Sequence, residues 1–467
     1  MVGKGSAKRG LSGWASMMVL FSTTIFVSAA LLFLVEPMFA KFVLPLFGST
    51  PAVWTASMMF FQGALLASYL YVHATASWLG ARRQAVLHLV LVLLPLLVLP
   101  LAVPEGWAPP ADSNPVFYLL GLLLVAVGLP FFAVAATNPL IQRWLSETDH
   151  PAARDPYFLY RASNLGSVIG LLGYPLLMEP ELRLASQGTF WTVGYGVLVV
   201  LVFASAAMLW RSRPPAATHD EPESMTDGSS LGESPAPSGL SRAPTLLRRL
   251  RWVGLAFVPS SMMLGVTAFI TTDITPIPLL WVIPLSLYLF SFVIVFSRGR
   301  RMPDLVHKVM VGALPIMMAL LTITMLTNVR NPFWLIIVLH LLGFFVVAMV
   351  LHGELARDRP PARHLTEFYL WVAVGGVLGG VFNALVAPVA FPGVVEYPLA
   401  IVLACLFLPG AVLSRLVQWD EERGEPRGTT RRFLDPRLLD LVLPLALGVA
   451  VVVLSWGFST VASPEWN

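Results

Sequence analysis

The chain has 467 residues, of which 57% are hydrophobic and 12% are charged, and its formal net charge is +4. Soluble domains carry about 25% charged residues, and the mean hydropathy here is +0.75, so the composition excludes a water-soluble globule. The basic residues fall in short loops between apolar runs and form no continuous face, which argues against a nucleic-acid partner. The single cysteine, Cys405, has no second thiol for a disulfide or a thiolate metal cluster.

Apolar runs follow one another along the whole chain, each close to the ~20 residues that a helix needs to cross a bilayer. About thirteen such spans are expected, at 13–35, 52–75, 84–103, 115–137, 157–178, 187–210, 252–271, 276–297, 305–327, 332–352, 366–388, 396–413 and 438–459. The predicted fold class is therefore an all-α polytopic membrane protein. The first span is longer than a signal-peptide core and no small-residue cleavage site follows it, so it is expected to be retained.

The arginines and lysines predict the orientation of the chain. They concentrate in alternate loops, beginning with Lys4, Lys8 and Arg9 at the N-terminus and including the loop of Arg82 and Arg83. Because short cytoplasmic loops are enriched in basic residues, the N-terminus is expected in the cytoplasm. The expected location is the inner (cytoplasmic) membrane of a bacterium.

Composition also predicts how the chain is divided. The segment 211–251 contains a stretch rich in Pro, Ser, Gly and Glu without apolar periodicity, which is typical of a disordered linker. It separates an N-terminal half of about six spans at 1–210 from a C-terminal half of about six spans at 252–413. A basic cytoplasmic loop at 414–437 and an extra membrane helix with an outer tail at 438–467 complete the prediction.

Two features suggest that the halves are a duplication. Basic turns follow the second span of each half, Gly80-Ala81-Arg82-Arg83 and Gly299-Arg300-Arg301. The fifth span of each half opens with aromatic residues and carries glycines four apart, which favours close helix packing. A six-plus-six repeat joined by a long linker is similar to the architecture of major-facilitator transporters, although the acidic member of that superfamily's cytoplasmic signature is missing.

Longer strings support a narrower resemblance. They are Glu36-Pro37-Met38-Phe39-Ala40-Lys41, Gly48-Ser49-Thr50-Pro51-Ala52-Val53-Trp54, Phe60-Phe61-Gln62, Asn138-Pro139-Leu140-Ile141-Gln142-Arg143-Trp144, Asp155-Pro156-Tyr157-Phe158-Leu159-Tyr160, Ala162-Ser163-Asn164-Leu165-Gly166-Ser167, Val258-Pro259-Ser260-Ser261, Thr271-Thr272-Asp273, His352-Gly353-Glu354-Leu355-Ala356, His364-Leu365-Thr366 and Phe382-Asn383-Ala384. Together they resemble the membrane part of the bacterial fused major-facilitator/spermidine synthase proteins, over nearly the whole chain outside the linker.

That resemblance implies a membrane module followed by a cytoplasmic aminopropyltransferase-like domain of Rossmann type. No Gly-rich loop after a strand and no βαβ pattern occurs in this sequence, so the catalytic domain is expected to be absent from this chain. The tail after 459 looks like part of a loop, which suggests either a truncated chain or a variant without the catalytic half. No catalytic residue, cofactor or metal site is assigned.

Polar residues within the apolar spans are the candidate binding residues. Glu36 and Lys41 flank Pro37, which could break the helix and let them pair; the alternative is that both reach the outer interface. Asp273 is expected either to line a cavity or to cap a helix end. The four amides in or near spans are expected either to line a cavity or to form interhelical hydrogen bonds; they are Gln62, Asn138, Asn164 and Asn383.

Arg161 lies about one turn inside the fifth span, where Tyr157 and Tyr160 could stack on it. It is expected either to reach the cytoplasm or to bind an acidic group at the cytoplasmic mouth. His352 and Glu354 superficially resemble a metal motif, but no second ligand pair follows, so they are interpreted as a helix-end cluster facing Arg357.

Two function classes remain. In the first, the chain is a membrane module that supports polyamine-related aminopropyl transfer by a missing or separate soluble domain. In the second, it is a major-facilitator-type transporter of a small polar or cationic metabolite, with Glu36, Asp273 and the amides lining a cavity between the halves. An intramembrane enzyme is disfavoured because no nucleophile or metal constellation is apparent. The lipid bilayer is the expected surrounding.

Overall fold

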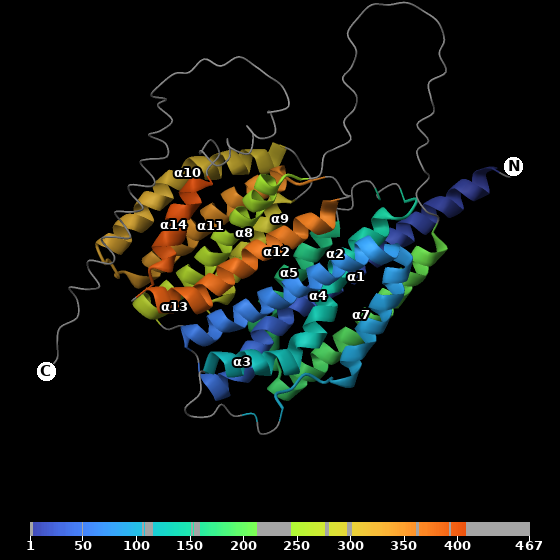
Figure 1. Ribbon diagram of the computed structural model, residues 1–467, viewed down its shortest axis with the longest axis horizontal. Coiled ribbons are helices and arrows are strands. Elements are labelled where there is room, and N and C mark those ends of the chain that lie inside the picture. The colour runs from blue at the N-terminus through green and yellow to red at the C-terminus, as the bar shows by residue number, and fades with distance from the viewer. Residues whose placement is uncertain are drawn as a thin grey trace, which may run out of the picture.

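The protein is a bundle of long apolar helices, which the computed structural model describes over residues 3–48, 50–104, 107, 115–150, 153, 159–212, 244–275, 280–296, 301–360, 364–391 and 394–407 (Figure 1). Within these ranges every regular element is a helix. Eight helical runs there are long and apolar enough to cross a bilayer, where a helix pairs its own backbone groups in the absence of water. The predicted all-α, multi-pass membrane class is confirmed, and the count of about thirteen crossings stays a prediction.

The helices fall into two groups in chain order, before and after the predicted linker. The first group is α1 (Gly3–Phe47), α2 (Pro51–Leu93), η1 (Leu94–Leu97), α3 (Pro115–Leu123), η2 (Leu124–Gly128), α4 (Leu129–Ser146), α5 (Leu159–Gly173), η5 (Tyr174–Met178), α6 (Glu179–Glu181) and α7 (Leu184–Arg211). The second is α8 (Leu246–Phe269), η6 (Ile270–Ile274), α9 (Val282–Val295), α10 (Arg301–Leu326), α11 (Phe333–Arg357), α12 (Leu365–Val381), η8 (Phe382–Val386), α13 (Ala387–Ala390) and α14 (Glu396–Leu406). Figure 1 shows the two groups side by side, coloured blue to green and yellow to orange.

Helix α2 reverses direction at Gly80. A straight helix of 43 residues would be about 65 Å long, twice the thickness of the hydrocarbon core, which is about 30 Å. Gly80 has φ 69° and ψ 161°, a conformation that is essentially restricted to glycine. Gln84 then donates a hydrogen bond of 2.8 Å to Thr75, and the rings of Tyr71 and His88 lie 6.3 Å apart. The label α2 therefore covers two antiparallel segments, which correspond to the predicted spans 52–75 and 84–103.

The same helix pairings occur in both groups. Helix α1 packs along α5 as α8 packs along α12, and α2 packs on α4 as α9 packs on α11. Between the groups, α2 packs on α12 and α5 packs on α9. Each of these contacts thus has a counterpart at the equivalent position when the two groups are exchanged.

Glycines permit close approach in two of these pairings. A Cβ atom on Gly166 or Gly170 of α5 would lie 2.3 Å from the backbone oxygens of Phe26 and Ala30 in α1. A Cβ on Gly375 of α12 would lie 2.3 Å from the Val253 backbone oxygen in α8. The prediction that the glycines four apart serve helix packing is confirmed.

Several boundaries differ from those predicted. Helix α1 continues to Phe47 through Pro37 and Pro45, so the predicted interruption at Pro37 is wrong. Helix α8 begins at Leu246, because the Thr245 hydroxyl caps it by accepting a hydrogen bond of 3.3 Å from the Arg248 backbone N–H. The helix thus takes in the last residues of the predicted linker. Most of that linker, the basic loop 414–437 and the extra helix 438–459 lie outside the described residues.

Candidate functional site

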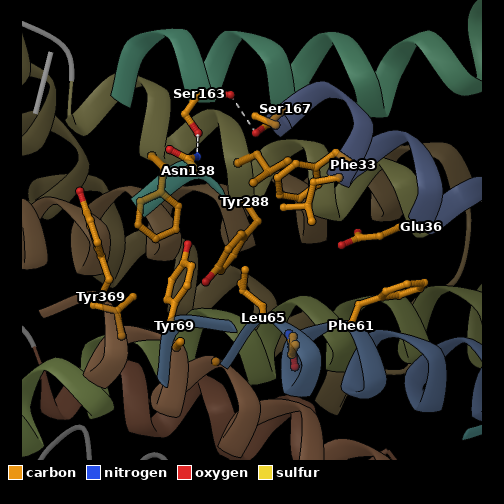
Figure 2. A pocket seen from close by; sticks show the side chains of 18 of the residues that line it. Phe33, Glu36, Phe61, Leu65, Tyr69, Asn138, Ser163, Ser167, Tyr288 and Tyr369 are labelled. Atoms are coloured by element: carbon orange, nitrogen blue, oxygen red, sulfur yellow. Dashed lines mark hydrogen bonds between the residues drawn. The ribbon is translucent and has the colours of Figure 1, made fainter. Parts of the chain in front are cut away.

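A cavity of about 180 Å³ lies between the two helix groups (Figure 2). Helices α1, α2, α4 and α5 line it from one side, and α8, α9 and α12 from the other. Each of the long helices lines the cavity with residues from one of its faces. On α1 these residues include Leu32, Phe33 and Glu36. The cavity therefore forms where the two groups meet.

Glu36 is the one acidic or basic side chain among the described residues that line the cavity. It is only 6% exposed, and its Oε2 atom has no hydrogen-bond partner within the described part of the chain. Figure 2 shows its carboxyl group directed toward the space between Phe33, Phe61 and Tyr288. An unpaired charge is costly at membrane depth. Among the described lining residues, this carboxyl group is therefore the one that would attract a cation most strongly.

The predicted pairing of Glu36 with Lys41 is wrong. Because α1 stays helical through Pro37, residues five positions apart point in different directions. Lys41 instead forms an ion pair with Glu179 of α6, and its side chain is 37% exposed. It does not belong to the cavity lining, and Glu36 has no basic partner in the part of the chain that the structure describes.

Polar side chains at the other end of the cavity form a chain of hydrogen bonds across α12, α4 and α5. The Tyr369 hydroxyl donates to Gln142 Oε1 over 3.2 Å, and Gln142 Nε2 donates to Asn138 Oδ1 over 3.0 Å. Asn138 Nδ2 in turn donates to the Ser163 hydroxyl. Asn164, also a predicted candidate, is buried in the same lining. No role for Gln142 and Tyr369 is predicted from the sequence, although the spacing of four between Asn138 and Gln142 is a usable signal.

The remaining two amides differ in their surroundings. Gln62 lines the cavity and donates a hydrogen bond of 3.0 Å to the Ser260 hydroxyl of α8. Asn383 is not among the lining residues; it donates to Ser261 over 2.8 Å and to the Gly379 backbone oxygen over 2.9 Å. Asn383 thus forms the interhelical hydrogen bond that was one of the two expectations.

Two further charged candidates, besides Lys41, lie away from the cavity. Asp273 lies in the π-helical turn η6 at the end of α8, half-buried, and does not line the cavity. Arg161 has an exposed side chain on α5 and does not line it either. Tyr157 and the side chain of Tyr160 lie outside the described residues, so their predicted stacking stays a prediction.

Aromatic side chains that the sequence alone does not identify as lining residues form much of the cavity wall. Tyr288 and Phe292, four apart on α9, both line it, with ring centroids 5.4 Å apart. Tyr69 of α2 and Tyr369 of α12 meet across the groups with centroids 6.2 Å apart. The faces of such rings attract cations, so the wall and the carboxylate favour the same type of ligand.

A charged cluster lies at the end of α11. Glu354 pairs with Arg251 over 2.9 Å, with His307 over 3.1 Å and with Arg357 over 3.6 Å. Glu354 thus belongs to the predicted helix-end cluster that faces Arg357, whereas His352 lies apart from it and forms a hydrogen bond of 2.6 Å with Ser291 of α9. Within the described ranges, no group of three or more His, Cys, Asp or Glu is placed to hold a metal ion.

No protein-family model matches the chain, and no match is found among curated proteins. The fold and the cavity thus define a class, a multi-pass helical membrane protein with a central, carboxylate-bearing cavity. The resemblance to the fused major-facilitator/spermidine synthase proteins stays a prediction.

Proposed function

We propose that this protein is a carrier that binds a small organic cation in the central cavity and moves it across the membrane. The observation that carries the proposal is Glu36, a buried carboxyl group that has no partner among the described residues and faces a cavity between two helix groups. A low-dielectric cavity strengthens the attraction between such a group and a cation. Secondary transporters built from two repeats bind their substrates at the interface of those repeats.

The helix pairing supports a six-plus-six repeat of the major-facilitator type. Exchanging the two groups converts the contact of α2 with α12 into the contact of α9 with α5, and both contacts are present. Two related groups of this kind can rock about a shared site, which is the usual basis of alternating access. In the proposed orientation, with the N-terminus in the cytoplasm of a bacterial cell, Glu36 lies toward the outer end of the cavity and Gln142 toward the cytoplasmic end.

The test is uptake of labelled amines by proteoliposomes that contain the full chain. The panel is putrescine, spermidine, choline and phenethylamine. We expect at least one of them to accumulate, and Glu36→Gln, which keeps the side-chain shape, to reduce its uptake by at least about tenfold, equivalent to about 1.4 kcal/mol of lost interaction. Glu181→Gln is the matched control, because Glu181 is an exposed residue of α6.

Two results would overturn this proposal. One is the absence of uptake of every amine in the panel by a well-folded preparation. The other is equal uptake by wild type and Glu36→Gln, since the cavity carboxylate would then have no part in transport.

A second candidate function rests on the sequence strings that resemble the fused major-facilitator/spermidine synthase proteins. In this case the chain is a membrane module that supports aminopropyl transfer by a soluble aminopropyltransferase-like partner. Gentle extraction of the native membrane should then copurify such a partner with the chain. Glu36→Gln would leave this association unchanged, which separates the two candidates.

A further inference from the structure

We infer that the cavity selects a cation with a single ammonium group, joined by a short arm to an apolar body about the size of one ring, over polyamines. This inference rests on the proposed function, because it treats the central cavity as the substrate site. It narrows the substrate class from small organic cations in general to amphipathic monoamines. Three properties of the cavity carry it, namely its charge, its wall and its volume.

The charge of the cavity matches one ammonium group. Glu36 supplies the one carboxylate among the described lining residues, and the other polar groups of the lining are neutral amides and hydroxyls. A second or third ammonium group would leave water without meeting an opposite charge, which is unfavourable. Putrescine and spermidine carry two and three amines, so a site with one carboxylate disfavours both.

The polar groups farthest from Glu36 already satisfy one another. Asn138 donates to Ser163 and accepts from Gln142, while Gln142 also accepts from Tyr369. A second ammonium group at this end would have to break one of these hydrogen bonds and would find no carboxylate. The far end thus suits a part of the ligand that forms no strong polar contacts.

The wall of the cavity suits an apolar body next to the charge. Phe33 and Phe61 lie on the two sides of the Glu36 carboxyl group, and Tyr288 lies toward the centre (Figure 2). Ring faces bind ammonium groups and also pack against apolar groups. The ammonium group can therefore meet Glu36 while the rest of the ligand packs on Tyr288 and Phe292.

The volume limits the size of that body. The cavity measures about 180 Å³, whereas sites for drug-sized ligands begin at about 300 Å³. A closed apolar cavity of about 150 Å³ holds one benzene molecule. The space at hand thus fits one ring with a short amine-bearing arm, for which phenethylamine is the simplest probe.

The experiment measures binding to the full chain, purified in detergent, by isothermal titration calorimetry. The probes are phenethylamine, 2-phenylethanol as the uncharged analogue of the same shape, putrescine and spermidine. We expect phenethylamine to bind at least about tenfold more tightly than each of the other three probes. Glu36→Gln should lose at least tenfold in affinity for phenethylamine, and Glu181→Gln should bind it as wild type does.

The failure of this inference can be distinguished from the failure of the proposed function. Binding or uptake of spermidine that depends on Glu36 and equals or exceeds that of phenethylamine would overturn the inference and leave cation transport standing. Equal affinity for 2-phenylethanol and phenethylamine would overturn it too. If no probe binds and no amine is taken up, both fail.

Since the ranking of the four probes is measured on wild type, the test holds even if Glu36→Gln does not fold, and Glu36→Asp then serves as the charge-retaining variant.

Discussion

At the scale of single residues, Glu36 and Lys41 show how neighbouring charges on one helix can have different roles. Both lie on α1, but Glu36 is buried against the cavity while Lys41 reaches a partly exposed carboxylate on α6. Exposed ion pairs contribute little to stability because solvent screens them. A buried group without a partner, in contrast, needs either a ligand or a proton to neutralise its charge.

We therefore predict that Lys41→Met lowers the free energy of unfolding by no more than about 1 kcal/mol and leaves amine uptake intact. Unfolding of the purified protein in detergent and proteoliposome uptake are the two measurements. Glu179→Gln is the matched variant at the other end of the pair, and the double variant should cost no more than the larger of the single changes. Loss of uptake in Lys41→Met would assign Lys41 to the transport path, against this account.

Sequence reasoning identified part of this residue-level picture. It selected Glu36, Gln62, Asn138 and Asn164 because polar groups within apolar runs are costly, and all of these line the cavity. It could not reveal that Lys41 meets Glu179, since that depends on where α6 lies against α1. Nor could it separate lining aromatics such as Tyr288 from those that face lipid, because both faces of a membrane helix are apolar.

At the scale of helices, close packing depends on glycines at defined positions. Gly375 and Gly376 are adjacent on α12, yet a Cβ atom on Gly375 would meet the α8 backbone at 2.3 Å while one on Gly376 would meet nothing within 4 Å. Backbone atoms cannot move aside as a flexible side chain can. Replacing either glycine with alanine adds the same methyl group, but in a different packing environment.

We predict that Gly375→Ala lowers the free energy of unfolding by about 1–3 kcal/mol, the usual cost of overpacking. Gly376→Ala should leave stability unchanged or raise it slightly, because alanine favours helices over glycine by about 1 kcal/mol. Denaturation in mixed detergent measures both variants. Equal stability of the two variants would mean that α8 and α12 are farther apart than described.

The helices also show where sequence patterns succeed and where they stop. Hydropathy predicts the two segments of α2 as separate spans, and the turn at Gly80 lies between them. Conversely, α5 is not among the eight apolar runs; it contains Arg161 as well as Ser163, Asn164 and Ser167, which line the cavity. Polar residues that line a cavity thus lower the hydropathy by which a membrane-spanning helix is recognised in a sequence.

At the scale of the whole molecule, contacts between the helix groups occur at both ends of the cavity. Along α2, the indole ring of Trp54 lies 5.1 Å from that of Trp281 before the lining residues begin. After they end, His73 forms a hydrogen bond of 3.0 Å with Thr366. If the groups rock about the cavity, each of these contacts must open in turn.

We predict that joining residues 73 and 366 with a short thiol-reactive crosslinker stops amine uptake but not amine binding. The variant is His73→Cys with Thr366→Cys, in a background in which Cys405 is replaced by Ala. The same variant without crosslinker, and each single-cysteine variant with it, are the controls. Undiminished uptake after complete crosslinking would exclude a rocking motion that opens this end.

The Glu36 carboxyl group, alone in its charge among the described lining residues, also determines where the membrane potential acts. A carrier that holds a monovalent cation next to Glu36 is electrically neutral at membrane depth, whereas an empty carrier with Glu36 ionised has one negative charge there. A voltage contributes about 2.3 kcal/mol per elementary charge for each 100 mV. The potential would then act on the return of the empty carrier and not on the loaded step, so currents measured during transport should arise from the unloaded half of the cycle.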